Sequence, residues 1–206
     1  MKIQPNSRQI PSIERYTAND SYDDLLYGLL QTMSYSETID GDTVRYVDKK
    51  DVTFTKLAPQ MGLSRQKVSE HFKQLIELGL VEEDLNTNGK KRYKLINLDM
   101  NVASLVGVTT LQAMIDSLSH YSISIYVYCL KRYIANKEKP FITTHGQLKS
   151  FIGAATTTSS NNHIIVNVLN ILAKIGLINW MYEDVEDKAG NKKTIIKILE
   201  VSNTIK

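Results

Sequence analysis

The sequence predicts a mainly α-helical protein with small β-hairpins (an α+β class), built from two similar halves. Three observations carry this prediction. Apolar residues recur at helical spacing over several segments, each half places a hairpin after a helix that ends at glycine, and Leu75–Val81 is repeated as Leu172–Ile178. An internal repeat of this kind indicates two copies of one supersecondary unit.

Length and composition agree with two modules. The 206 residues allow two domains of about 100 residues each. The single cysteine, Cys129, cannot form an internal disulfide, which fits a reducing cytoplasm. No apolar run approaches the ~20 residues that span a bilayer, and the N-terminus lacks the apolar region of a secretory signal. We therefore expect a cytoplasmic protein with no membrane partner.

The expected organisation has three parts. Residues 1–20, polar and interrupted by Pro5 and Pro11, read as a flexible arm. Residues 21–100 form the first module, and residues 101–206 form a long helix followed by the second module.

In the first module, helical periodicity and capping signals define three helices before a hairpin. Their expected bounds are Tyr22–Met33, Phe54–Met61 and Arg65–Leu78, followed by strands Leu80–Leu85 and Lys91–Leu98. Gly62 suits the left-handed end of the second helix, and Ser64 suits the cap of the third. Ser34–Asp51 is polar and turn-rich, with a short alternating piece around Tyr46.

In the second half, one long helix is expected from about Leu111 to Ala135. After it the pattern of the first module returns. Its expected elements are a short strand at Phe141–Ile142, a short helix Gln147–Ile152, a longer helix that is capped by Ser160 or Asn161 and runs to Ile175, and strands Leu177–Glu183 and Thr194–Val201. This copy differs by an insert, Ala154–Ser159, between its two short helices.

The segment Thr55–Val81 resembles the winged helix-turn-helix of bacterial regulators. Leu57 and Ala58 are placed to pack on Val68 and Phe72, and the small Ala58 permits a close helix crossing. A helix of this kind enters the major groove of DNA with its N-terminal residues on base edges. The sequence therefore predicts two tandem winged-helix domains joined by a long helix.

Candidate DNA-binding residues follow from this resemblance. On the first module they are Ser64, Arg65, Gln66, Lys67, Ser69 and Lys73 of the recognition helix, with Lys90, Lys91 and Arg92 of the wing. Arg65 and Lys67 suit guanine, Gln66 suits adenine, and the wing residues suit phosphates. Glu70 on the same helix either accepts a hydrogen bond from cytosine or is simply solvated. A charge run such as the wing is also often only a solvated loop.

The second module gives a less typical pattern. Its candidate DNA-binding residues are His163, Asn167 and Asn170 of the long helix, with Lys192 and Lys193 of the wing. Ile164, Val166 and Ile171 widen the apolar surface of this helix beyond one face, which suggests contact with the first module or with a partner subunit.

The tandem arrangement is similar to the initiator proteins of plasmid and phage replication. That resemblance implies binding to double-stranded DNA at repeated origin sites, with half-sites about 10 base pairs apart. A homodimer and contacts with replication proteins remain open as further partnerships. A transcriptional regulator of a mobile element is the first alternative, and a winged-helix pair that binds proteins in a replication or segregation complex is the second.

The sequence gives no support for an enzyme. The four histidines are scattered singly, and no phosphate-binding glycine loop, paired carboxylate site or Cys-His cluster is present. We therefore expect no catalytic residues, no metal site and no cofactor.

Overall fold

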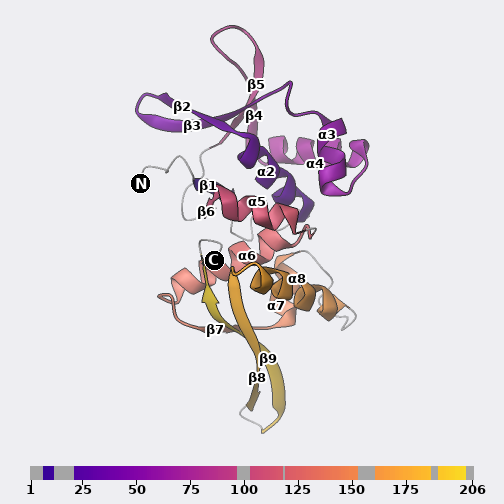
Figure 1. Cartoon of the computed structure of the whole chain (residues 1–206), viewed down its shortest axis with the longest axis vertical. Helices are drawn as coiled ribbons and strands as arrows, with labels where there is room; N and C mark the ends of the chain where they lie inside the picture. The colour runs from indigo at the N-terminus through magenta and orange to yellow at the C-terminus, as the bar shows by residue number, and fades with distance from the viewer. Residues whose placement is uncertain are drawn as a thin grey trace.

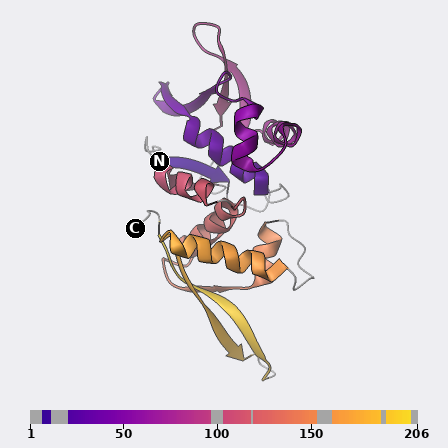
Figure 2. The same ribbon diagram turned by 45° about the vertical axis from the view of Figure 1, so that its right-hand side comes forward.

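The computed structural model describes residues 7–11, 21–96, 103–117, 119–152, 161–186 and 190–202. The molecule is elongated, with the first module at one end and the second at the other (Figure 1). The helices α2, α5 and α6 lie between the two ends, and the β4–β5 and β8–β9 hairpins project in opposite directions (Figures 1 and 2).

The first module contains helices α2 (Ser21–Met33), α3 (Phe54–Met61) and α4 (Arg65–Glu77), in agreement with the sequence. Its wing is the hairpin of β4 (Val81–Leu85) and β5 (Lys91–Leu95). The buried sides of α2, α3 and α4 meet in one apolar core that includes Leu26, Leu57 and Leu75. The helical periodicity of the sequence is what this core requires.

The wing sheet is larger than expected. The polar segment after α2 forms strands β2 (Tyr35–Ile39) and β3 (Asp42–Asp48), and the sheet has the order β2-β3-β5-β4. The β2–β3 turn places Asp40 (φ 51°) and Gly41 (φ 87°) in the left-handed region, as a tight hairpin turn demands. β2 is almost entirely exposed, so it carries no alternating apolar pattern that the sequence could reveal.

Part of the expected N-terminal arm is ordered. Residues 7–11 form β1 (Ser7–Pro11), which pairs antiparallel with β6 (Ala103–Gly107). The buried Arg8 donates from Nε to the backbone oxygen of Gln31 at 2.6 Å and so ties β1 to α2. The prediction of a flexible arm is therefore wrong for these residues, and the rest of 1–20 lies outside the described part of the chain.

The single long helix expected from Leu111 to Ala135 is two helices, α5 (Val108–Asp116) and α6 (Ser122–Ala135). Serines explain the break. Ser117 Oγ donates to the carbonyl of Met114 at 2.5 Å and lies 2.8 Å from Ser122 Oγ. Serine side chains that bond to the backbone in this way compete with helical hydrogen bonds.

The second module repeats the plan of the first. It contains β7 (Phe141–Thr143), α7 (His145–Phe151), α8 (Asn162–Lys174), β8 (Ile178–Glu186) and β9 (Lys192–Val201), in a sheet of order β7-β9-β8. Thr144 and Gln147 form a reciprocal capping box at the start of α7. The insert predicted at 154–159 lies outside the described residues.

The two modules meet along a seam between α2 and the α5–α6 region. Gly28 lies so close to α6 that a Cβ there would come within 2.8 Å of Ile123 Cδ1. Ser124 Oγ donates to Asp24 Oδ2 at 2.6 Å, and the rings of Tyr22 and His120 stack at 4.1 Å. The buried core is continuous across this seam. The division at residue 100 therefore does not coincide with a gap in packing, and the domain bounds themselves stay a prediction.

The seam gives an expected pH dependence. Burial raises the pKa of Asp24 to about 7, although its bond from Ser124 opposes the shift and neighbouring Asp23 adds to it. The unfolded chain releases this proton near the ordinary value of 3.8, so the folded state holds more protons between about pH 4 and 7. The protonated Asp24 therefore contributes fully to the free energy of unfolding below about pH 4, and this contribution declines as the pH rises to about 7. Chemical denaturation across this range should show a smaller decline for Asp24→Asn, and an unchanged decline would contradict the assignment.

Within the described residues, no helix is both long enough and apolar enough to cross a bilayer.

Candidate nucleic-acid interface

The helix-turn-helix is built as its sequence predicts. Gly62 adopts φ 65° at the end of α3, and the N–H of Leu63 returns to the carbonyl of Ala58 at 3.0 Å. Ser64 Oγ caps α4 by accepting from the N–H of Lys67 at 3.3 Å. Ser64 is thus an exposed residue whose established contact positions the recognition helix.

The outer face of α4 presents the predicted reading residues. Arg65, Gln66, Lys67 and Lys73 are exposed, and Ser69 is half-buried. Among the described residues, no ion pair involves Arg65 or Lys73. These two cations are available to an anionic partner without first breaking an internal bridge.

Glu70 organises the middle of this face. Its carboxylate accepts from Lys67 Nζ at 2.7 Å and from Gln66 Nε2 at 3.2 Å. Hydrogen bonding from Lys67 is the largest cause that lowers the pKa of Glu70, so the carboxylate is ionised. Glu70 is therefore not merely solvated: it orients two of the predicted readers and offers an acceptor beside them.

The hidden side of α4 is fixed to α2 by a polar contact that the sequence did not reveal. His71 is buried, with Nδ1 2.8 Å from Asp23 Oδ1. With its amide oriented to suit this network, Gln74 donates to the same carboxylate at 3.0 Å. Because Asp23 is itself buried, this contact sets the angle at which α4 lies on α2.

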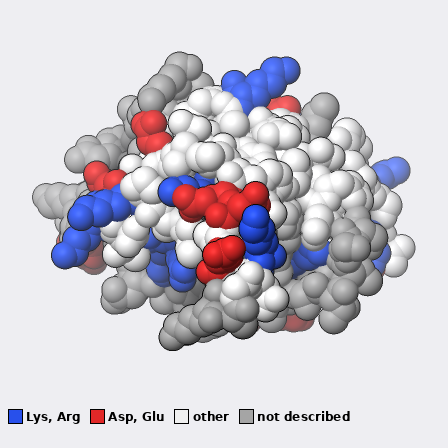
Figure 3. All heavy atoms as spheres, turned by 90° about the horizontal axis from the view of Figure 1, so that it is seen from below, with Lys and Arg blue, Asp and Glu red and all other residues white. Residues whose placement is uncertain are grey.

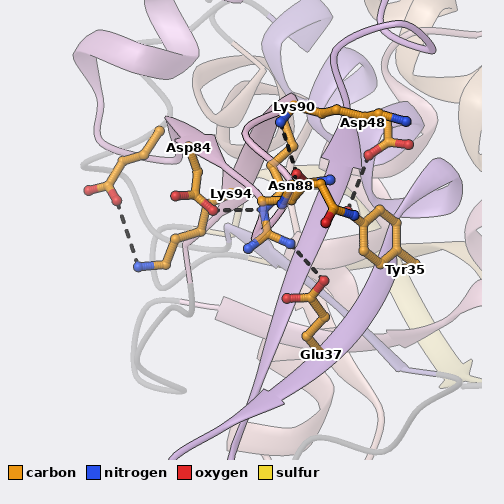
Figure 4. A network of polar contacts seen from close by, with 10 residues as sticks. Tyr35, Glu37, Asp48, Asp84, Asn88, Lys90 and Lys94 are labelled. Carbon is orange, nitrogen blue, oxygen red and sulfur yellow. Dashed lines mark hydrogen bonds and ion pairs between the residues drawn. The ribbon is translucent and has the colours of Figure 1, made fainter.

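Arg92, which the sequence places among the DNA-binding residues of the wing, is instead taken up by contacts within the wing sheet. It is buried, with Nε 2.7 Å from Asp84 Oδ2, Nη1 2.6 Å from Glu37 Oε1 and its guanidinium 3.5 Å from the centre of the Tyr46 ring. Figure 4 shows the carboxylates of Asp84 and Glu37 reaching this guanidinium from two strands. Burial alone would lower the pKa of Arg92, but its hydrogen bonds with Tyr35 and these carboxylates raise it. Arg92 binds the sheet together and has no surface for phosphate.

Replacing Arg92 with Met should therefore lower stability rather than DNA affinity. We expect a loss of about 1–3 kcal/mol, less than for a fully shielded pair, because water still reaches both carboxylates. Urea denaturation measures this loss, and the exposed neighbour Lys91→Met serves as control. An Arg92→Met protein of wild-type stability but weaker DNA binding would restore the original assignment.

The tip of the first wing keeps two available lysines. Asn86 Oδ1 accepts from the backbone N–H groups of Asn88 and Lys90 at 3.0 and 2.9 Å, which fixes the turn. Lys90 and Lys91 are exposed and form no ion pair with the described residues. Lys94, by contrast, lies 3.8 Å from Glu82. The acidic residues of the wing therefore offset the positive charge of Lys94, away from the tip, and leave Lys90 and Lys91 at the tip without an ion pair to a described residue.

The long helix of the second module exposes a stripe of polar residues. His163, Asn167 and Asn170 are exposed on α8, with Lys174 in its last turn, and the opposite side buries Ile165, Leu169 and Leu172. The stripe follows the helical repeat, so these side chains share one face. The predicted readers of this module are thus brought together.

The second wing carries both signs of charge. Lys192 and Lys193 are exposed opposite Glu186 and Val185, and Lys197 is paired with Glu183 at 2.7 Å. Acidic and basic side chains lie side by side over the end of the molecule seen from below (Figure 3). Lys192 and Lys193 form no ion pair with other described residues, so within the described part of this wing they are the cations available to a phosphate.

Comparison with known proteins agrees with this construction. Residues 44–83, from β3 through α4 into β4, match the model of a family described as bacterial regulatory protein, arsR family. The structure is similar to the crystal structure of Pi initiator protein in complex with iteron DNA, with a TM-score of 0.51, 13% sequence identity, and coverage of 97% of this chain and 99% of that chain. No curated protein matches the sequence significantly. At this identity the likeness concerns the fold, and it confirms the two tandem winged-helix modules expected from the sequence.

Proposed function

We propose that this protein binds double-stranded DNA sequence-specifically through α4 and α8, as a replication initiator of a plasmid or phage. The observation that carries the proposal is the pair of exposed recognition helices in a fold that aligns over almost its whole length with an initiator solved on iteron DNA. A cytoplasmic location, a homodimer and contacts with replication proteins belong to the same proposal.

The mechanism is binding without a chemical step. Arg65, Gln66 and Lys73 contact base edges in one major groove, and Asn167 and Asn170 contact those in the next. Lysines at the two wing tips hold the phosphates on either side. The seam between α2 and α6 fixes the distance between the two recognition helices, so a site of the correct spacing binds without rearrangement.

A transcriptional regulator of a mobile element is the second candidate, because the arsR family match covers the first recognition helix and the start of its wing. The two roles differ in the arrangement of their sites. An initiator of this kind is expected to occupy direct repeats, whereas a dimeric regulator is expected to occupy a palindrome.

A footprint on the DNA that flanks the gene tests the proposal. Direct repeats of the protected site support an initiator, and a palindrome supports the regulator. Absence of any protected site, together with no salt-dependent binding, would overturn both and leave a winged-helix pair that binds proteins.

The wing tip of the first module should act on all DNA sequences alike. Replacing Lys90 and Lys91 with Ala removes two phosphate contacts. The negative slope of log K, the logarithm of the DNA-binding constant, against log salt concentration should therefore become shallower by about 1.8. The affinities for specific and for non-specific DNA should fall by similar factors. Titration at several salt concentrations measures the slope, and Lys139→Ala removes an exposed lysine outside both wings as a control. An unchanged slope would place the wing tip away from DNA.

A further inference from the structure

The two modules share a scaffold but present different chemistry to DNA. The repeated segments Leu75–Val81 and Leu172–Ile178 end both recognition helices in the same way, at Gly79 (φ 67°) and Gly176 (φ 76°). The buried sides are also alike, with aliphatic residues such as Val68 and Ile165. Two copies of one recognition helix would be expected to bind two similar half-sites if their exposed residues were also alike. The exposed faces of α4 and α8 therefore decide whether the half-sites are similar.

The face of α4 is charged and carries an adjacent donor and acceptor. Lys67 and Glu70 lie 2.7 Å apart at positions i and i+3, and Gln66 is bonded to the same carboxylate. In the major groove a G·C pair presents the acceptors N7 and O6 of guanine beside the N4 donor of cytosine. A lysine next to a carboxylate complements that pattern, with Lys67 on guanine and Glu70 on cytosine. Arg65, with no ion pair to a described residue, offers a second contact for guanine.

The face of α8 is uncharged over most of its length. Asn162–Lys174 contains no acidic residue, and its one cation is Lys174 in the last turn. The exposed readers Asn167 and Asn170 are amides. An amide pairs in two places with the N6 donor and N7 acceptor of adenine, which is a pattern that guanine does not offer.

We propose that the preferred DNA site is a composite of two unlike half-sites: a G·C-containing half bound by α4 through Arg65, Lys67 and Glu70, and an adenine-containing half bound by α8 through Asn167 and Asn170. The two halves lie about one helical turn apart. This proposal rests on the DNA binding proposed above and adds the base composition and direction of the site. A protein whose two readers differ binds each site in one orientation.

Glu70 has a further consequence for discrimination. A carboxylate in the groove repels phosphates, so it weakens every complex in which α4 is out of register. A base amino donor in register, such as cytosine N4, returns the lost hydrogen bond. Glu70→Gln keeps the shape and a hydrogen-bonding oxygen but removes the charge, so it should strengthen non-specific binding while it lowers the preference for the G·C half.

Selection of binding sites from a random duplex pool tests the proposal, using the full chain as wild type, Glu70→Gln and Asn167→Ala/Asn170→Ala. Wild type should enrich one G·C-containing block and one adenine-containing block about 10 base pairs apart. Glu70→Gln should relax only the first block, and the Asn double variant only the second, each by roughly 5- to 150-fold per lost base contact. Each variant is thereby the control for the other half.

The outcomes separate this inference from the proposed function. If wild type enriches no sequence, the proposed DNA reading itself fails. If it enriches two similar blocks or a palindrome, DNA binding stands and the composite site is wrong. If each variant relaxes both blocks equally, the assignment of helices to halves is wrong. The wild-type result decides the composition of the site even if a variant does not fold.

Discussion

Replacing Arg65 and Gln66 together with Ala is expected to remove most of the discrimination that the α4 half of the site provides against random DNA. Both side chains lie in the first turn of α4, the part of a recognition helix that reaches base edges, and both are exposed. Each lost base contact should cost about 1–3 kcal/mol of discrimination. Competition binding against random duplex DNA measures the ratio.

The comparison with the wing makes this result specific. The Lys90→Ala/Lys91→Ala protein should lose affinity for both DNAs and keep its preference, whereas Arg65→Ala/Gln66→Ala should lose the preference at the α4 half of the site. If the Arg65 and Gln66 variant still distinguished its site as wild type does, the first module would not be the reader.

Truncating Phe72 is expected to give the largest loss of stability. Phe72 is 4% exposed, and its ring lies 5.7 Å from that of Phe54 and 4.8 Å from that of Tyr93, so it joins α3, α4 and β5. Phe72→Ala leaves a cavity among these elements and should cost about 3–5 kcal/mol. For a chain of this length the melting temperature should fall by roughly 6 to 20 °C.

Ile76→Ala provides the matched control on the same helix. Ile76 is 39% exposed, so its truncation should change stability far less. Thermal unfolding followed by circular dichroism measures both variants. Equal melting temperatures for the Phe72→Ala and Ile76→Ala proteins would show that the contacts of Phe72 with Phe54 and Tyr93 do not hold α4 in place.

The local rules of capping and periodicity predicted the helix-turn-helix well. The end of α3 at Gly62 and the cap at Ser64 were expected, because each depends on a residue and its immediate neighbours. The hairpin at Val81–Leu95 was expected as two strands after the helix, for the same reason. The repeat of this pattern was enough to predict the second module.

The misses share a physical cause, which is dependence on distant partners. β2 is an exposed edge strand that depends on pairing with β3 and on the contact of Glu37 with Arg92, and β1 depends on β6, almost 100 residues away. The break between α5 and α6 is accompanied by a bond from Ser117 to the backbone and a contact between Ser117 and Ser122, which the apolar spacing does not show.

The candidate site divides in the same way. Arg65 and Lys73 were placed correctly on an exposed face because helical spacing determines it. The ion pair of Arg92 with Glu37, which lies two strands away in the same sheet, could not be read from the residues near Arg92. The alternation of strand residues was the available signal, since it places Arg92 and Lys91 on opposite faces.

The central claim is that one chain reads two consecutive major grooves through α4 and α8. Hydroxyl-radical footprinting of the complex on its selected site measures this most directly. The account predicts two protected segments centred about 10 base pairs apart on one face of the duplex, with the second lost in Asn167→Ala/Asn170→Ala. A single protected segment that is unaffected by changes in α8 would contradict it.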